Sequence, residues 1–203
     1  MKKSRTISVW LWLGALLWVA LLGTRSILER SLVGHAVLQV GLLVLSGWCI
    51  GRWLNAALGR SRAGEAGLVL AAFTLAVWML PRSLDAALRD ASWEIAKFVS
   101  VPLLVGVPVA RAWAHLPTIV RGLLWANILS MLITLGWVYW TAPTRLCNNY
   151  LLTDQPLLAK AFWGLAALVA IVLLVRITVA PRVCTQHRAD AASESSLTCI
   201  KRV

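Results

Sequence analysis

Charged residues crowd a short polar stretch between two apolar runs in the middle of the chain. Asp85 and Arg89 are four residues apart, as are Asp90 and Glu94, and Lys97 follows three residues after Glu94. On a helix these spacings make the side chains neighbours, and the pairs of opposite charge, Asp85 with Arg89 and Glu94 with Lys97, attract each other. Glu94 and Lys97 also lead directly into an apolar run, and charges near the membrane interior are usually paired or functional. The stretch therefore predicts either an interfacial helix with mutually satisfied ion pairs or a polar site at the membrane edge.

Two other residues, His35 and Cys147, could bind a metal ion. His35 stands at the start of an apolar run, and an imidazole in a membrane can bind copper or carry a proton. Cys147 lies in the polar segment 141–150, which we expect on the oxidising side, where an unpaired thiol is unusual and could bind Cu(I). Each has a structural alternative, since a single histidine often hydrogen-bonds to a neighbouring helix and a thiol can be buried at a helix end. The other polar residues expected at the outer face are Gln39, Arg82, Asp85, Arg89, Asp90, Glu94, Lys97, Arg145 and Asn148.

The composition indicates that these residues belong to a membrane protein. Apolar residues make up 60% of the 203 residues and charged residues 14%, whereas a soluble domain carries roughly 45–50% and about 25%. The apolar residues form long runs, which favours lipid as the surrounding solvent. We therefore expect an all-α fold, a multi-pass transmembrane bundle over residues 1–181 in contact with the lipid bilayer. Its helices, about six by length and hydropathy, are expected near residues 8–23, 32–50, 66–81, 94–113, 123–140 and 156–179.

The two ends of the chain differ in character, since the first is apolar and the last is polar. The first apolar segment follows Lys2, Lys3 and Arg5, as the apolar core of a signal peptide would. It ends in Leu-Leu-Gly-Thr-Arg rather than in a small-x-small cleavage site, so an uncleaved helix is favoured. Residues 182–203 are polar, and we expect a disordered cytoplasmic tail there.

The basic residues set the expected orientation. A net charge of +12 would suggest nucleic acid in a soluble protein, but here Lys and Arg flank the apolar runs. Such flanking is typical of loops held in the cytoplasm, so we expect no nucleic-acid partner. Their distribution places both termini in the cytoplasm of a bacterial-type cell, with the protein in its inner membrane. The tryptophans near the predicted helix ends are typical of an aromatic belt.

The fourth apolar run contains two helix-breaking residues and a glycine, Pro102, Pro108 and Gly106. Each proline removes a backbone hydrogen bond and permits a kink. Broken membrane helices can mark transport sites, although prolines are also common in ordinary membrane helices.

No sequence motif for catalysis is found. The chain has no G-x-S-x-G, P-loop, H-E-x-x-H or dinucleotide-binding pattern, so we expect that the protein is not an enzyme. Its cysteines include no C-x-x-C pair, and Cys184, His187 and Cys199 are too irregularly spaced for a metal site. Copper is the one cofactor that the residues suggest.

The stretch from Trp78 to Asp85, followed by Glu94 to Pro108, resembles the CtaG-like cytochrome c oxidase assembly membrane proteins. In that family a Leu-Pro element precedes a helix with a His-Met-x-x-His pattern, which ends in a Pro-Leu-Leu-x-x-Gly-x-Pro-like turn. Here Leu80-Pro81 matches the first element, and the run from Pro102 to Pro108 matches the last. The family is taken to help deliver copper to the oxidase from the outer side of the membrane.

The chain departs from the family pattern at the residues that would bind copper. Glu94 and Lys97 stand where the pattern places its histidines, and a protonated lysine is a poor copper ligand. His35 and Gln39 could be a half-missing His-x-x-x-His arrangement. The leading hypothesis is an accessory protein for respiratory oxidase assembly or copper handling at the periplasmic face, with a respiratory complex or another membrane protein as partner. The alternatives are a small transporter or channel component, and a non-catalytic scaffold subunit.

Overall fold

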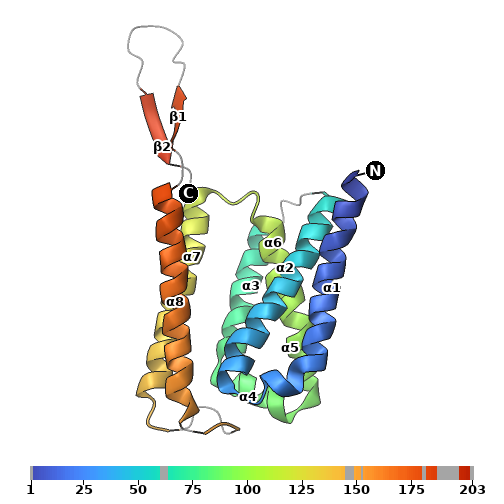
Figure 1. Ribbon diagram of the computed structural model, residues 1–203, viewed down its shortest axis with the longest axis vertical. Helices are drawn as coiled ribbons and strands as arrows, with labels where there is room; N and C mark the ends of the chain where they lie inside the picture. Colours follow the sequence, from blue (N-terminus) through green and yellow to red (C-terminus); the bar gives the residue numbers. More distant parts are fainter. Residues whose placement is uncertain are drawn as a thin grey trace.

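Helices make up nearly all of the structure (Figure 1). The computed structural model describes residues 2–59, 64–144, 149–151, 153–179, 182–186 and 197–201. The helical elements are α1 (Lys2–Leu28), η1 (Gly34–Gln39), α2 (Val40–Ala57), α3 (Gly64–Met79), α4 (Pro81–Arg89), α5 (Ala91–Ser100), η2 (Val101–Gly106), α6 (Val107–Ala112), α7 (Thr118–Thr141) and α8 (Asp154–Val179), of which η1 and η2 are π-helical. Two short strands follow, β1 (Arg182–Gln186) and β2 (Leu197–Lys201).

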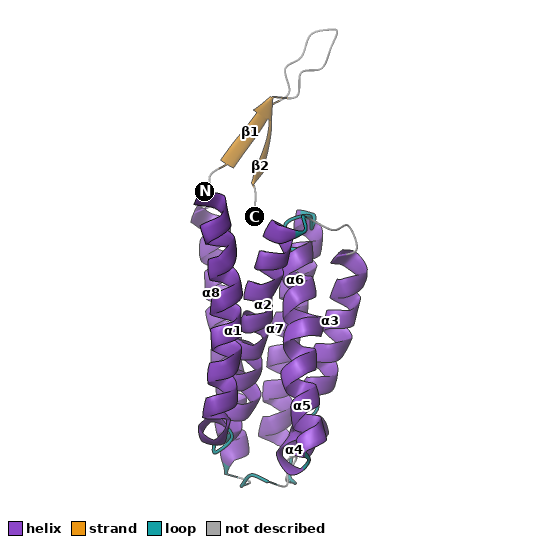
Figure 2. Ribbon diagram, turned by 90° about the vertical axis from the view of Figure 1, so that its right-hand side faces the viewer, coloured by secondary structure: helices purple, strands orange, loops and turns teal. Residues whose placement is uncertain are grey.

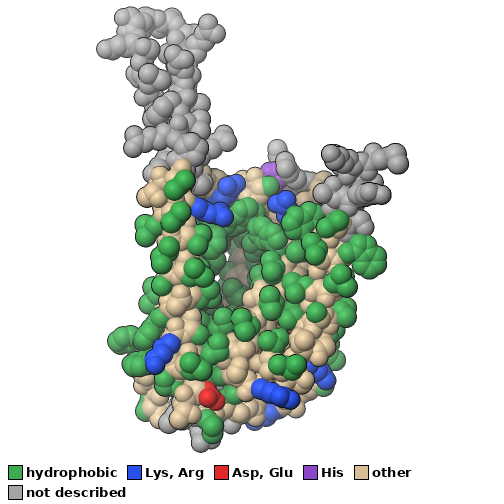
Figure 3. Space-filling model, in the orientation of Figure 1, with side chains coloured by type: hydrophobic (Ala, Val, Ile, Leu, Met, Phe, Trp, Pro, Cys, Tyr) green, Lys and Arg blue, Asp and Glu red, His purple; other side chains and the backbone are tan. Residues whose placement is uncertain are grey.

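The expected multi-pass bundle is confirmed. Five helical stretches are long and apolar enough to cross a membrane, namely Val9–Leu28, Gly34–Ala57, Ala91–Ala112, Thr118–Thr141 and Asp154–Val179. A sixth span results if Ala66–Met79 and Pro81–Arg89 are counted together, although they are bent by 70°. Hydrophobic side chains cover the sides of the helices, and Lys and Arg side chains lie near the ends (Figure 3). This distribution is that of a surface in contact with lipid.

The bend between α3 and α4 follows from the Leu80-Pro81 pair. Leu80 has an extended backbone, with ψ of 129°, and Pro81 lies in the first turn of α4. The residue before a proline avoids the helical region, and the first helical turn does not need the proline's missing N–H. On α4, Leu84 is buried while Arg82 and Arg89 are exposed. The short helix closes the end of the bundle opposite to the start of α1 (Figure 1).

Two glycines allow α2 and η2 to touch backbone to backbone. A Cβ built on Gly106 would lie 2.6 Å from the Cα of Gly47, and one built on Gly47 would collide with the backbone of Pro102. Such close contact of small residues is the usual way in which helices pack inside membranes. The run that contains the two prolines is π-helical over η2, where Pro102 lies in the first turn and has no N–H to donate, and it continues as α6 from Val107.

The α7–α8 hairpin stands beside the α1–α6 bundle (Figures 1 and 2). Near α4, Tyr139 of α7 and Leu158 and Phe162 of α8 share one buried cluster with Leu32 and Leu43. At the other end, a smaller cluster of Leu68, Ala112 and Leu116 packs against α7. The hairpin is therefore attached to the bundle at both of its ends.

Two segments of the C-terminal tail form an antiparallel pair, with Cys184 opposite Cys199. Disorder was expected over residues 182–203, and it stays a prediction, since the structure describes only these two segments of the tail. Both contain β-branched residues, Val183 and Thr185 in one and Thr198 and Ile200 in the other, which favour strands. Residues 187–196 lie outside the described residues. α1 begins and α8 ends at the same end of the molecule (Figure 2), and the side of the membrane that this end faces stays a prediction.

Candidate functional site

Four polar side chains meet inside the bundle near α4: Glu29, His35, Gln39 and Lys97, called here the buried polar cluster. His35, Gln39 and Lys97 are each 0% exposed. The Nζ of Lys97 lies 2.8 Å from Oε1 of Gln39 and 3.5 Å from Oε1 of Glu29. Gln39 Nε2 donates to the same Glu29 oxygen at 3.1 Å. Candidates that lie far apart in the sequence are thus brought together, with Glu29 as their shared partner.

The turn after α1 and the first turn of η1 position this cluster. Glu29 lies in that turn. Ser31 caps the helical segment that leads into η1, because its hydroxyl accepts the N–H of Gly34 and its carbonyl accepts the N–H of His35, both at 3.0 Å. Lys97 comes from α5, directly before η2. Isolated π-helical turns are frequent at functional sites, and both π-helical segments of the described chain adjoin this cluster.

Lys97 brings a charge into an apolar environment, so its partners must compensate for lost water. The Gln39 oxygen and the Glu29 carboxylate accept from its ammonium group, and the ring of Phe98 lies 5.4 Å from Nζ. A buried ion pair of this kind is roughly neutral against a well-packed apolar pair, but removal of one partner costs about 3–5 kcal/mol. The cluster therefore favours one arrangement of α1, η1 and α5 over others.

His35 has one ring nitrogen without a hydrogen-bond partner. Its Nε2 lies 3.3 Å from the carbonyl oxygen of Leu84, which can only accept, so Nε2 carries the proton. Nδ1 is buried without a hydrogen-bond partner and lies 4.0 Å from Oε1 of Glu29. In the neutral ring Nδ1 can only accept a hydrogen bond, and the Glu29 carboxylate oxygen that it faces also accepts.

A second layer joins α4 and the α7–α8 connection to the cluster. Asp85 is 5% exposed and pairs with Arg89, as the spacing predicted. Its Oδ1 also accepts the side-chain and backbone N–H groups of Asn149, at 2.9 and 3.2 Å. The hydroxyl of Tyr150 donates to the backbone carbonyl of Glu29 at 2.7 Å. The residues after α7 are therefore tied both to α4 and to the turn that carries Glu29.

Glu94 pairs with a residue outside its own helix. Its carboxylate accepts from Arg25 of α1 at 2.8 and 2.9 Å. The ion pair of Lys97 among the described residues is instead with Glu29. The expectation that Glu94 and Lys97 would act as one helical pair is wrong, because Lys97 points into the bundle while Arg25 reaches Glu94 from α1.

The remaining members of the expected outer set lie apart from the cluster. Asp90 caps α5, where its Oδ1 accepts the backbone N–H of Ser92 at 2.9 Å, and this hydrogen bond lowers the pKa of the Asp90 carboxyl. Arg82 is exposed on α4. Arg145, Cys147 and Asn148 lie outside the described residues.

The buried polar cluster does not fit a copper ion. Among the described residues, no group of three or more His, Cys, Asp or Glu side chains could hold a metal. His35 and Glu29 supply the nearest donor atoms, and the Lys97 ammonium occupies the space beside them. Cys49 is a free cysteine buried in α2, and it belongs to no such group of described residues. Metal binding through Cys147 stays a prediction.

Sequence reasoning did not place Glu29, Tyr150 or Asn149 in the site. Glu29 is a single acidic residue in a short turn, and nothing in its local pattern indicates a lysine 68 positions further on. Asn149 and Tyr150 are the last two residues of the polar segment 141–150, which drew attention to Cys147, so membership of that segment was the available signal. Comparison of the chain with protein-family models, with curated proteins and with solved structures finds no match in any of the three.

Proposed function

We propose that this chain is a non-catalytic accessory protein of a bacterial inner membrane, which supports assembly of a respiratory oxidase from the end that carries α4. The observation that supports it is the buried polar cluster, which gathers at one end of the bundle and fixes the elements that form that end. The resemblance to oxidase assembly proteins involves the same elements, since Trp78–Asp85 spans the α3–α4 bend and Glu94–Pro108 spans α5, η2 and the start of α6.

In this proposal the cluster holds a docking surface in shape. Beyond the cluster, Leu80 is 55% exposed, Trp93 43% and Ile95 64%, with Arg82 and Arg89 exposed nearby on α4. An apolar surface edged by basic residues suits a partner membrane protein with an acidic edge. Lys97 takes part indirectly, as a positioning residue that joins α5 to Glu29 and Gln39.

The transport alternative finds less support in the packing of the helices. A solute path through the α1–α6 bundle would have to separate α2 from η2, where Gly47 and Gly106 leave no room even for a Cβ. The polar residues of the cluster also stop at the level of Gln39, and the bundle continues with Val40 and Leu43, which are 1% and 0% exposed. An accessory role needs no such path.

The test compares oxidase content in cells that lack the gene, complemented by three forms of the protein. The wild type and Lys160→Met, which removes an exposed lysine of α8, are expected to restore oxidase activity and haem content in isolated membranes. Lys97→Met is expected to restore them poorly while the protein itself accumulates in the membrane. Unchanged oxidase content and copper sensitivity in the deletion strain would overturn the proposal.

A further inference from the structure

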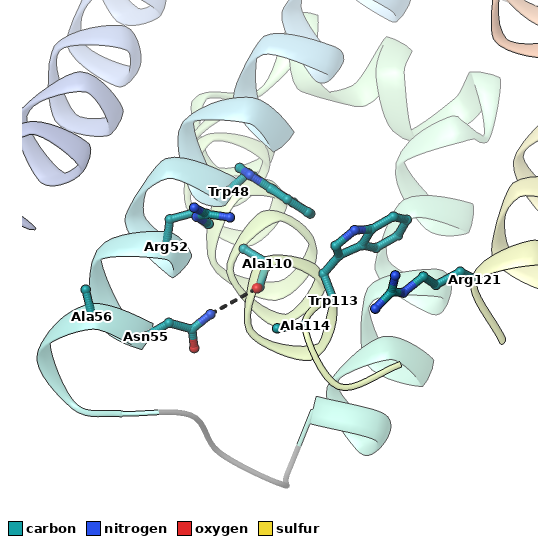
Figure 4. A pocket seen from close by; sticks show the side chains of 8 residues that line it. All are labelled: Trp48, Arg52, Asn55, Ala56, Ala110, Trp113, Ala114 and Arg121. Carbon is teal, nitrogen blue, oxygen red and sulfur yellow. Dashed lines mark hydrogen bonds between the residues drawn. The ribbon is translucent and has the colours of Figure 1, made fainter. Parts of the chain in front are cut away.

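A second polar site lies at the end of the bundle away from α4. A cavity of about 340 Å³ opens between α2, α6 and the start of α7 (Figure 4). Its lining residues are Trp48, Arg52, Asn55, Ala56, Ala110, Trp113, Ala114 and Arg121. It contains no residue of the buried polar cluster, so the inference drawn from it is independent of the oxidase proposal.

Two arginines give the cavity an uncompensated positive charge. Arg52 and Arg121 both line it, without a carboxylate, and neither forms an ion pair with another described residue. Aromatic rings hold both guanidinium groups: Arg52 lies 5.3 Å from the ring of Trp10, and Arg121 lies 5.8 Å from that of Trp113. Cation–π contacts orient an arginine but do not neutralise it.

The cavity also contains one buried donor and one buried acceptor that lack partners. Nε of Arg121 has no hydrogen-bond partner, and neither does Oδ1 of Asn55. The amide nitrogen of Asn55 donates to the carbonyl of Ala110 at 3.0 Å (Figure 4), which fixes the orientation of the amide and leaves Oδ1 available. Unpartnered buried polar groups are uncommon and call for a ligand or a water.

The chemistry of these groups specifies the ligand. Guanidinium groups bind phosphate oxygens through charge-assisted hydrogen bonds. A hydroxyl beside the phosphate would donate to Oδ1 of Asn55, which a bare phosphodiester cannot do. One turn before Trp48 on the same face of α2, Leu45 is 48% exposed and offers a surface for an acyl chain. Basic pockets between membrane helices bind anionic lipid headgroups in this way.

We propose that this cavity binds the headgroup of an anionic glycerol-type phospholipid, with Arg52 and Arg121 on the phosphate and Asn55 on a headgroup hydroxyl. Trp48 and Trp113 form the apolar wall, and their rings pack edge to face at 5.8 Å. By the distribution of basic residues this end is predicted to face the cytoplasm, where a membrane presents its anionic surface.

Native mass spectrometry of the full chain in detergent tests the site with four probes: phosphatidylglycerol, phosphatidylcholine, phosphatidic acid and inorganic phosphate. The wild type is expected to retain phosphatidylglycerol at least about tenfold better than phosphatidylcholine. Each of Arg52→Gln and Arg121→Gln should weaken retention about tenfold, because each removes charge-assisted hydrogen bonds. Asn55→Leu should lower the preference for phosphatidylglycerol over phosphatidic acid, which lacks the headgroup hydroxyl.

The matched control is Arg176→Gln, which removes an exposed arginine near the same end of α8 and should leave retention unchanged. Arg121→Lys keeps the charge without the fork of donors and should retain an intermediate amount, which separates ligand contact from loss of folding. Equal retention of phosphatidylcholine, equal effects of Arg176→Gln and Arg121→Gln, or displacement of the lipid by millimolar inorganic phosphate would overturn the proposal.

Discussion

Removal of the Lys97 ammonium group should destabilise the protein through the partners that it leaves behind. In Lys97→Met the methionine fills most of the space of the lysine stem with apolar atoms, so little packing is lost. What remains is the Glu29 carboxylate, with 18% of its side chain exposed and only the Gln39 amide as a cluster partner. The substitution therefore tests the loss of the Lys97 charge with little change in side-chain volume.

The size of the effect follows from how deeply each charge is buried. Loss of one partner of a buried ion pair costs about 3–5 kcal/mol. Glu29 keeps some contact with water, so we expect Lys97→Met to lower the free energy of unfolding by about 3 kcal/mol, at the low end of this range. Glu29→Gln should cost more, about 4 kcal/mol, because the ammonium group that it abandons is 0% exposed. The double variant buries neither charge, so its loss of unfolding free energy should be much smaller than the sum of the losses in the two single variants.

The assay is reversible unfolding of the purified protein in mixed micelles, with the double-mutant cycle as the readout. A coupling free energy of at least about 2 kcal/mol between Lys97 and Glu29 is expected. Lys160→Met is the control: this exposed side chain lies 6.0 Å from the Trp140 ring, and its loss should change stability by no more than about 0.5 kcal/mol.

Additive effects in the cycle would refute the reasoning. If Lys97→Met and Glu29→Gln each destabilised the protein and the double variant lost the full sum, the two groups would act independently. A neutral Lys97→Met would also contradict the account, since the carboxylate would then need no cation.

Three further predictions concern packing, copper and pH. Gly106→Ala should cost about 1–3 kcal/mol by overpacking against α2, whereas Gly41→Ala, whose Cβ meets nothing within 4 Å, should be neutral or stabilising in the same unfolding assay. Cu(I) stoichiometry on purified protein should be unchanged by His35→Ala, and any retained copper should be lost in Cys147→Ser; loss in His35→Ala would contradict the poor fit of the cluster. The Asp90 cap, whose carboxyl has a lowered pKa, should protect the first turn of α5 from hydrogen exchange at neutral pH. This protection should be lost as the pH falls through the pKa of Asp90. Asp90→Ala should expose the turn at every pH, and Asp90→Asn should remove the pH dependence.

The helices could be predicted from the sequence because each depends on its own residues. Apolar runs indicate the membrane-spanning helices, and the Leu80-Pro81 pair accounts for the bend between α3 and α4. The four-residue spacing of Asp85 and Arg89 indicates their ion pair. These features need no knowledge of neighbouring helices. The break at Asp90 was not predicted, because the polar stretch from Asp85 to Lys97 was placed on one helix, whereas Asp90 ends α4 and caps α5.

The candidate site could be predicted only in part, because its contacts join helices whose packing one sequence does not specify. Glu94 has Lys97 as a neighbour in sequence, yet its partner is Arg25 of α1. Lys97 in turn finds Glu29, and which of these acidic residues it meets depends on how α5 is rotated against α1. The π-helical segment η1 carries Gln39, the other hydrogen-bond partner of Lys97, and no residue pattern in η1 predicted a π-helix.

The contact between Tyr150 and Glu29 has a consequence for the order in which the chain matures. The two residues are 121 positions apart, so the carbonyl of Glu29 leaves the ribosome long before its partner exists. The same holds for Asp85, which waits for Asn149, 64 positions later. Contacts of such long range close late in folding. The α4 end is therefore completed only when the last hairpin has been synthesised and inserted, and a nascent chain that stops earlier displays an unfinished end to the membrane.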